Sequence, residues 1–263
     1  MAGKTIVVTS GKGGVGKTTT VANLGTTLAK RKHSVVMLDA DIGLRNLDVV
    51  MGLENRIVYN IVDIIEGKCR KAQAMIRDRK LSNLYIIPAA QTREKNAVNP
   101  EQMKELCAEL ASEFDYVIID CPAGIEQGFK NAVAGADTAV VVTTPEVSAI
   151  RDADRVIGLL EAGMLRNIHL IINRLNVKMV KRGDMMSTED IISLLSVPLL
   201  GVVPESEEVV ISTNRGIPLV HERGSKAGAA FRRIADRLNG DSIPISEDGA
   251  GGFFNRMKRL IWN

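Results

Sequence analysis

Gly11-Lys12-Gly13-Gly14-Val15-Gly16-Lys17-Thr18 follows an apolar run at residues 5–9 and opens a segment with helical periodicity at residues 18–31. It fits the phosphate-loop pattern G-x-x-x-x-G-K-[ST], with a strand before it and a helix after it. The glycines let the backbone turn tightly and direct N–H groups at a polyphosphate, which also faces the positive end of the helix. A glycine-rich turn without a role in phosphate binding is the alternative, but it explains neither the strand nor the helix. The pattern predicts a nucleoside triphosphate site.

Individual residues of this loop have expected roles. Lys17 is placed to reach the outer phosphates, and the Thr18 hydroxyl is placed to hold Mg²⁺. Lys12 is an additional lysine, which is either a solvated surface charge or a second phosphate ligand. The predicted nucleotide-binding residues are Gly11, Lys12, Gly13, Gly14, Val15, Gly16, Lys17, Thr18, Thr19 and Asn173.

Three aspartates follow predicted strands. Asp120 ends the apolar run at residues 116–119, where a Walker B carboxylate stands to hold the Mg²⁺ hydration shell. Asp39 and Asp41 follow the run at residues 34–38, and ligands of open α/β sheets bind at these carboxyl ends of strands. We assign Thr18, Asp39 and Asp120 to the metal, and Asp41 to the attacking water. The alternatives are a helix cap or turn at Asp120 and two solvated loop acids at Asp39 and Asp41.

Asn173 closes another predicted strand, at residues 168–172. Its amide offers a donor and an acceptor, which complement adenine. A guanine site of this kind carries Asn-Lys-x-Asp, whereas this chain has Asn173-Arg174-Leu175-Asn176 without the final acid. ATP is therefore favoured over GTP.

The composition limits other functions. The 263 residues carry a net charge of +3 and only 3% aromatic residues, which gives little support to nucleic-acid binding. The three cysteines are far apart in sequence, which argues for a reducing compartment and against a zinc site or a thiol-ligated cluster.

The order of the predicted elements gives the fold class. Nearly continuous Val/Ile/Leu runs alternate with helical segments, which predicts a doubly wound, mostly parallel α/β sheet with helices on both faces. The predicted strands are residues 5–9, 34–38, 84–87, 116–119, 139–143, 168–172 and 199–203. The predicted helices are residues 18–31, 101–113, 149–162, 188–195 and 226–238. We expect one domain at residues 1–240 and a flexible linker at residues 241–252.

The last segment, residues 253–263, is predicted to form a short amphipathic helix. Apolar side chains fall on one arc of the helical wheel and basic side chains outside it, as in interfacial membrane anchors. Packing of this helix on its own domain is the alternative. The candidate membrane-binding residues are Phe253, Phe254, Arg256, Met257, Lys258, Arg259, Leu260 and Ile261.

Together these motifs resemble the septum-site-determining ATPases of the ParA/MinD group. The resemblance includes Ser-Gly-Lys-Gly-Gly-Val-Gly-Lys-Thr-Thr at residues 10–19, Asp-Ile-Gly-Leu-Arg-Asn-Leu-Asp at residues 41–48 and Cys-Pro-Ala-Gly-Ile-Glu at residues 121–126. It implies a deviant Walker A motif, in which Lys12 crosses a homodimer interface to the partner's nucleotide. The catalytic residues are then Lys12, Lys17 and Asp41, and the cofactors are ATP and Mg²⁺.

The resemblance also implies partners and a location. Such ATPases are peripheral on the inner face of the cell membrane, or in the plastid, and bind anionic lipid. They recruit a MinC-like division inhibitor and respond to a MinE-like topological factor. The helix carrying Arg151, Asp152 and Asp154 is a candidate partner surface. The tail ends Ile261-Trp262-Asn263 rather than in the glycines frequent in the group.

Three other functions remain open at this stage. A ParA-type DNA-partitioning ATPase needs a basic face, and outside the tail only Lys178, Lys181 and Arg182 form a thin basic run. An iron–sulfur carrier needs paired cysteines. A scaffold that binds ATP without hydrolysing it would show no turnover.

Overall fold

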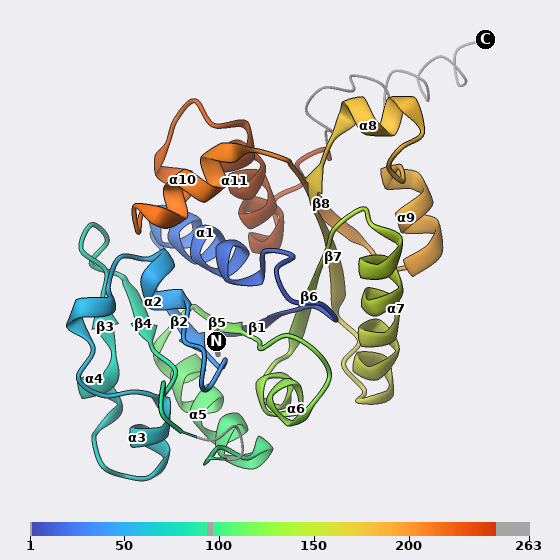
Figure 1. Cartoon of the computed structure of the whole chain (residues 1–263). Helices are drawn as coiled ribbons and strands as arrows, with labels where there is room; N and C mark the ends of the chain where they lie inside the picture. The colour runs from blue at the N-terminus through green and yellow to red at the C-terminus, as the bar shows by residue number, and fades with distance from the viewer. Residues whose placement is uncertain (1, 94–96, 246–263) are drawn as a thin grey trace.

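Strand β1 (Lys4–Thr9) pairs in parallel with β5 (Tyr116–Asp120) on one side and with β6 (Thr138–Thr143) on the other. The structure is a computed structural model that describes residues 2–93 and 97–245. Within these residues the sheet has eight strands in the order β3-β4-β2-β5-β1-β6-β7-β8 (Figure 1). The other strands are β2 (Val35–Asp39), β3 (Ile76–Arg77), β4 (Leu84–Ile87), β7 (Ile168–Leu175) and β8 (Leu199–Pro204).

The predicted doubly wound, mostly parallel sheet is confirmed, and β3 is the one addition among the described strands. It pairs antiparallel with β4, and all the other described pairs are parallel. With only two residues, β3 has no alternation of apolar and polar positions by which the sequence could reveal it.

Both faces of the sheet are buried because successive side chains of each strand enter different cores. In β2, Val35 and Met37 belong to one apolar cluster, and Val36 and Leu38 to the other. The first cluster is completed by α1 (Lys17–Lys30) and α11 (Lys226–Asn239). This is the pattern of a parallel sheet covered on both sides.

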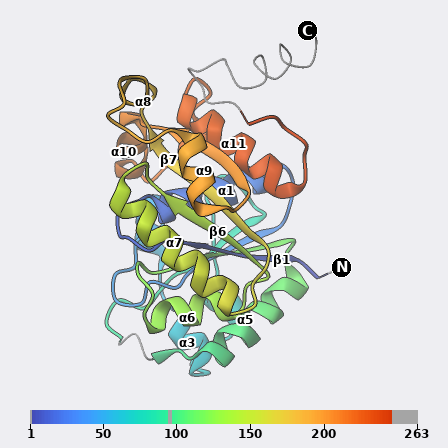
Figure 2. The ribbon, with the colours of Figure 1, turned by 90° about the vertical axis from the view of Figure 1, so that its right-hand side faces the viewer.

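The other face is covered by α5 (Pro100–Glu113), α6 (Gln127–Ala134), α7 (Val147–Ala162) and α9 (Thr188–Leu195). Figure 2 shows the layers from the side, with α11 above the sheet and α5 and α6 below it. The remaining helices are short: α2 (Leu47–Val50), α3 (Ile61–Ile65), α4 (Lys71–Ala74), α8 (Val177–Arg182), α10 (Glu207–Asn214), and the 3₁₀ turns η1 (Glu54–Arg56) and η3 (Leu219–His221).

Helix α11 ends at Asn239 and is capped by Gly240, whose φ of 109° suits glycine at a helix C-terminus. After α11 the backbone contacts the Arg237 side chain, which donates to the carbonyls of Ile243 and Pro244. The predicted membrane-binding helix lies outside the described residues. Among the described helices, none is long and apolar enough to cross a bilayer.

Candidate nucleotide site

The phosphate loop runs from the end of β1 into the start of α1, as predicted. Gly14 and Gly16 have φ of 75° and 102°, which other residues rarely adopt. Gly16 is the N-cap of α1, and Lys17 is its first residue. The loop therefore places the backbone N–H groups of a helix N-terminus where a polyphosphate can bind.

Lys17 lies over this loop rather than extending into solvent. It is buried, and its Nζ donates to Ser10 Oγ at 3.0 Å. Ser10 Oγ in turn donates to the carbonyl of Lys12 at 2.7 Å. Ser10 was not predicted as a site residue, because a serine beside glycines is typical of any turn. The structure assigns it the positioning of the Lys17 ammonium.

Lys12 stands on the outer side of the loop. Its side chain is 44% exposed, and its Nζ lies 3.4 Å from Glu146 Oε2 and 3.2 Å from Ser148 Oγ, at the start of α7. An ion pair this exposed contributes little stability and exchanges easily for another anion. The second-subunit role of Lys12 stays a prediction.

Asp39 and Asp120 lie side by side, because β2 and β5 are adjacent and these residues are in register at the strand ends. Both are almost completely buried. Burial raises the pKa of Asp120 well above its usual value and the charge of Asp39 raises it further, whereas Thr18 and Lys17 lower it. The sequence placed both carboxylates at one edge of the sheet, and the structure brings them together with Thr18 and Lys17.

This pair of acids fits a divalent cation. Asp120 Oδ1 is buried and has no hydrogen-bond partner among the described residues. No group of three His, Cys, Asp or Glu side chains that could hold a metal occurs in residues 2–93 and 97–245. A Mg²⁺ ion here would therefore take one or two carboxylates, the Thr18 hydroxyl, phosphate oxygens and water, which is its usual coordination.

Asp39 also organises the loop that follows it. Its carboxylate accepts from the backbone N–H groups of Asp41 at 3.0 Å, Asn46 at 3.1 Å and Leu47 at 3.2 Å. Burial raises the pKa of Asp39 to about 6, although these three bonds oppose the rise. Asp39 thus fixes where Asp41 stands, whether or not it contacts the metal shell.

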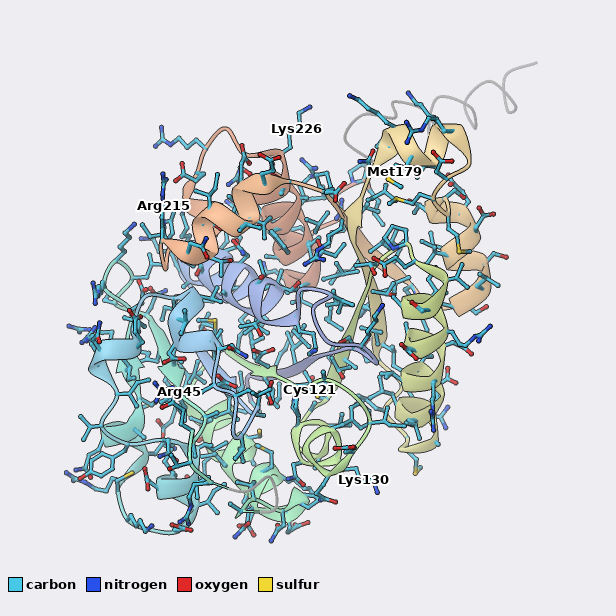
Figure 3. The ribbon with its side chains drawn as sticks, in the orientation of Figure 1. Arg45, Cys121, Lys130, Met179, Arg215 and Lys226 are labelled. Carbon is cyan, nitrogen blue, oxygen red and sulfur yellow. The ribbon has the colours of Figure 1, made fainter. Side chains whose placement is uncertain are left out.

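The loop continues to two charged residues that the sequence did not single out for the site. Arg45, which Figure 3 labels, has its Nε 3.1 Å from Oδ2 of the buried Asp48.

Cys121, which Figure 3 also labels, follows Asp120 and is buried. Burial raises the pKa of its thiol to about 12. Within residues 2–93 and 97–245, Cys121 belongs to no group of three His, Cys, Asp or Glu side chains that could hold a metal.

Asn173 lies inside β7, which continues to Leu175, so the predicted strand end at residue 172 was wrong. The amide of Asn173 reaches the site, but it already has protein partners. Its Nδ2 donates to the Val15 carbonyl at 2.7 Å, and its Oδ1 accepts from the backbone N–H of Arg174 at 2.9 Å. A Cβ at Gly16 would lie 2.3 Å from this Nδ2. Asn173 therefore holds the phosphate loop in place, and its contact with a base stays a prediction.

Helix α7 packs against the same loop. A Cβ on Gly11 would lie 2.4 Å from the Asp152 carbonyl oxygen, so this backbone needs glycine. Arg151 and Asp154 are exposed and Asp152 is half-buried. The three candidate partner residues thus lie within one helical turn of the phosphate loop, and their role stays a prediction.

The fold and this site define the class of protein. The chain belongs to the family described as the CobQ/CobB/MinD/ParA nucleotide binding domain, whose pattern matches residues 6–219. It is 56% identical over 265 residues to the septum site-determining protein MinD of Bacillus subtilis, with 98% of each chain covered.

Two solved structures are also similar to this chain. The MinC:MinD cell division protein complex of Aquifex aeolicus includes a chain with 47% identity and a TM-score of 0.87, covering 93% of this chain and 99% of that one. The septum site-determining protein MinD of Pyrococcus horikoshii, complexed with Mg-ADP, has 30% identity and a TM-score of 0.81, covering 90% of this chain and 96% of that one.

Proposed function

We propose that this chain is a Mg²⁺-dependent ATPase that helps to place the division septum by binding membrane in its ATP state. The observation that carries the proposal is Asp120, a buried carboxylate with one oxygen unpartnered, beside Lys17 and Thr18 of the phosphate loop. The relatives named above are septum site-determining proteins, and one of them was solved with Mg-ADP.

The proposed chemistry is transfer of the terminal phosphoryl group to water. Mg²⁺ would be held by Thr18 and Asp120, with Asp39 close by, and would supply charge neutralisation on the phosphates. Lys17 binds the outer phosphates, and Asp41 orients the attacking water. Phosphoryl transfer depends on positioning and charge neutralisation more than on a strong base, so a carboxylate is sufficient.

Lys12 is proposed to couple nucleotide to dimer formation. In the single chain its ammonium has only a loose contact with Glu146 and Ser148. The phosphates of a partner's nucleotide offer a much stronger opposite charge. ATP binding and dimerisation then form one equilibrium, with Lys12 acting like an arginine finger from the second subunit.

Membrane binding is proposed to follow from the dimer. Residues 253–263 of one chain form a weak anchor, because ordering costs about 1–2 kcal/mol per residue and offsets most of the gain from burial. Two anchors on one dimer act together, which raises affinity by about 10²–10⁴. The membrane-bound form then recruits a MinC-like inhibitor, a role supported by the Aquifex MinC:MinD complex. A MinE-like factor is proposed to stimulate hydrolysis.

The test is ATP turnover with and without anionic liposomes, for the full chain and for a chain ending at Gly252. The full chain is expected to pellet with liposomes in ATP and not in ADP. The truncated chain is expected to hydrolyse ATP but not to pellet. Equal pelleting of the full chain with ATP, ADP and no nucleotide would exclude a membrane cycle controlled by hydrolysis. ATP-dependent, salt-sensitive retention on DNA without any pelleting would favour the partitioning alternative.

A further inference from the structure

Four cations gather where the C-terminal end of α1 meets η3, α11 and the turn between β3 and β4. We call Lys30, Lys80, Arg223 and Arg232 the basic cluster. Lys30 Nζ and Arg232 Nη1 both donate to the Val220 carbonyl, each at 3.2 Å. Two positive side chains therefore converge on one oxygen atom, and Lys80 and Arg223 lie close enough to act on Lys30 electrostatically.

The charges of the basic cluster are poorly balanced. The pKa of Lys30 is lowered, first by burial and then by Arg232, Arg223 and Lys80. Two acids lie nearby: Asp78, which accepts from the backbone N–H groups of Lys80 and Leu81, and Glu222, which precedes Arg223. Asp236 pairs with Arg31, so the four cations outnumber the acids that remain beside them. A set of like charges that raise one another's energy is a binding surface for an anion.

The basic cluster also lies near the point where the chain leaves the sheet domain. Arg31, next to Lys30, holds Asp236 of α11 through two bonds of 2.7 Å. Asp241, directly after α11, is near enough to raise the pKa of Arg31. The linker to residues 253–263 therefore starts beside the basic cluster. Figure 3 shows Lys226, three residues after Arg223, pointing away from the body of the molecule.

We propose that the basic cluster is a second membrane contact, which binds the anionic headgroups of the bilayer into which residues 253–263 insert. This inference rests on the proposed membrane function and deepens it. The tail supplies apolar insertion, and the basic cluster fixes which side of the domain faces the lipid.

The position of the cluster, rather than its chemistry, favours lipid as the anion. Four cations could also bind the phosphates of duplex DNA, so DNA is an outcome of the test below. The predicted linker at residues 241–252 starts beside the cluster, and a coil of that length would span roughly 20 Å, so an inserted tail would bring the cluster within reach of the headgroups. Each cation close to an anionic leaflet strengthens binding by about five-fold.

The experiment compares two variants of the full chain with equal charge loss. Lys80→Gln/Arg223→Gln removes two cluster cations whose side chains make no hydrogen bond or ion pair within residues 2–93 and 97–245. Lys104→Gln/Lys130→Gln removes two exposed cations from α5 and α6, on the other face of the sheet. Binding is measured with ATP on vesicles of 70% phosphatidylcholine and 30% phosphatidylglycerol, at several salt concentrations, and melting by circular dichroism checks the fold.

The cluster variant is expected to bind about 20-fold more weakly than wild type and with a smaller salt dependence, while the control variant changes by less than about three-fold. Equal binding by wild type and the cluster variant would overturn this inference and leave the membrane function intact. Equal losses in both variants would also overturn it, because net charge alone would then explain the effect. Failure of wild type to bind any vesicle would instead reject the proposed function itself. Loss of duplex DNA binding without loss of vesicle binding would assign the cluster to nucleic acid.

Discussion

Asp120 is buried, and its Oδ1 has no hydrogen-bond partner among the described residues, which destabilises the charged form of the carboxyl. We propose that Mg²⁺ at this carboxylate would remove that destabilisation. Its folded-state pKa is raised, so the unfolded chain releases this proton at lower pH than the folded chain. The penalty is therefore absent near pH 4 and grows as pH rises toward the raised pKa.

Asp120→Asn is expected to raise the free energy of unfolding of the nucleotide-free protein at pH 7 by about 1–3 kcal/mol. The gain should vanish near pH 4, because wild-type Asp120 is protonated there. ATP turnover should fall by at least about 10²-fold. Urea unfolding at several pH values and a phosphate-release assay check both parts.

Asp115→Asn provides a control, because its expected change in the free energy of unfolding at pH 7 has the opposite sign. The backbone and side chain of Ser34 lower the pKa of Asp115. Its stabilisation is present above its ordinary pKa and is lost as pH falls through the lowered value, so this variant should be less stable at pH 7. If both variants lost stability at pH 7, the view of Asp120 as a strained carboxylate would be wrong.

A substitution of Lys12 tests the proposed dimerisation separately from the stability of the fold. Lys12→Gln removes only an exposed contact with Glu146 and Ser148, so the free energy of unfolding should change by less than about 0.5 kcal/mol. A fluorescent ATP analogue should still bind, while turnover should fall by about 10³-fold and dimers should be lost. Turnover within a few-fold of wild type would show that Lys12 has no role in a second subunit's site.

The sequence predicted which residues lie together at the site better than it predicted the hydrogen bonds between them. Asp39 and Asp120 end their strands and Asn173 lies near the end of β7, and parallel strands bring their carboxyl ends to one edge. That Asn173 binds the Val15 carbonyl, and that Ser10 holds Lys17, depends on side-chain orientations that no residue spacing contains.

At the level of elements, the contact between the phosphate loop and α7 can be tested with two glycines. Gly11→Ala would place a Cβ 2.4 Å from the Asp152 carbonyl oxygen, whereas at Gly13 the nearest atom is Ala123 Cβ at 3.8 Å. Gly11→Ala is expected to cost about 1–3 kcal/mol of stability and Gly13→Ala much less. Thermal unfolding of both variants checks this. Similar melting temperatures would mean that α7 does not constrain the loop.

The longest helices were predicted well, and the shortest ones were missed. Length is not the whole reason, because α6 and α10 have eight residues each, as α9 does, and were not predicted. Helix α9 was predicted with its observed ends, and α5 within one residue, because each shows at least two turns of periodicity. Helices α2, α3 and α4 have four or five residues, too few for any period. Helix α2 depends instead on Asp39, which binds the N–H of Leu47 from eight residues away.

At the scale of the whole molecule, the proposal is that one nucleotide controls where the protein resides. The phosphate loop, the neighbouring Asp39 and Asp120, and the start of α7 lie together at the carboxyl ends of the strands. The connection to residues 253–263 begins directly after α11. The proposed control of membrane binding by the nucleotide site requires no conformational change within one chain, because dimerisation alone doubles the number of anchors.

Sedimentation velocity of the full chain with Mg²⁺ and a hydrolysis-resistant ATP analogue tests this claim most directly. We expect a species of twice the mass of one chain with the analogue, a single chain with ADP, and a single chain for Lys12→Gln under both conditions. Wild-type protein that stays a single chain at saturating analogue would contradict the account.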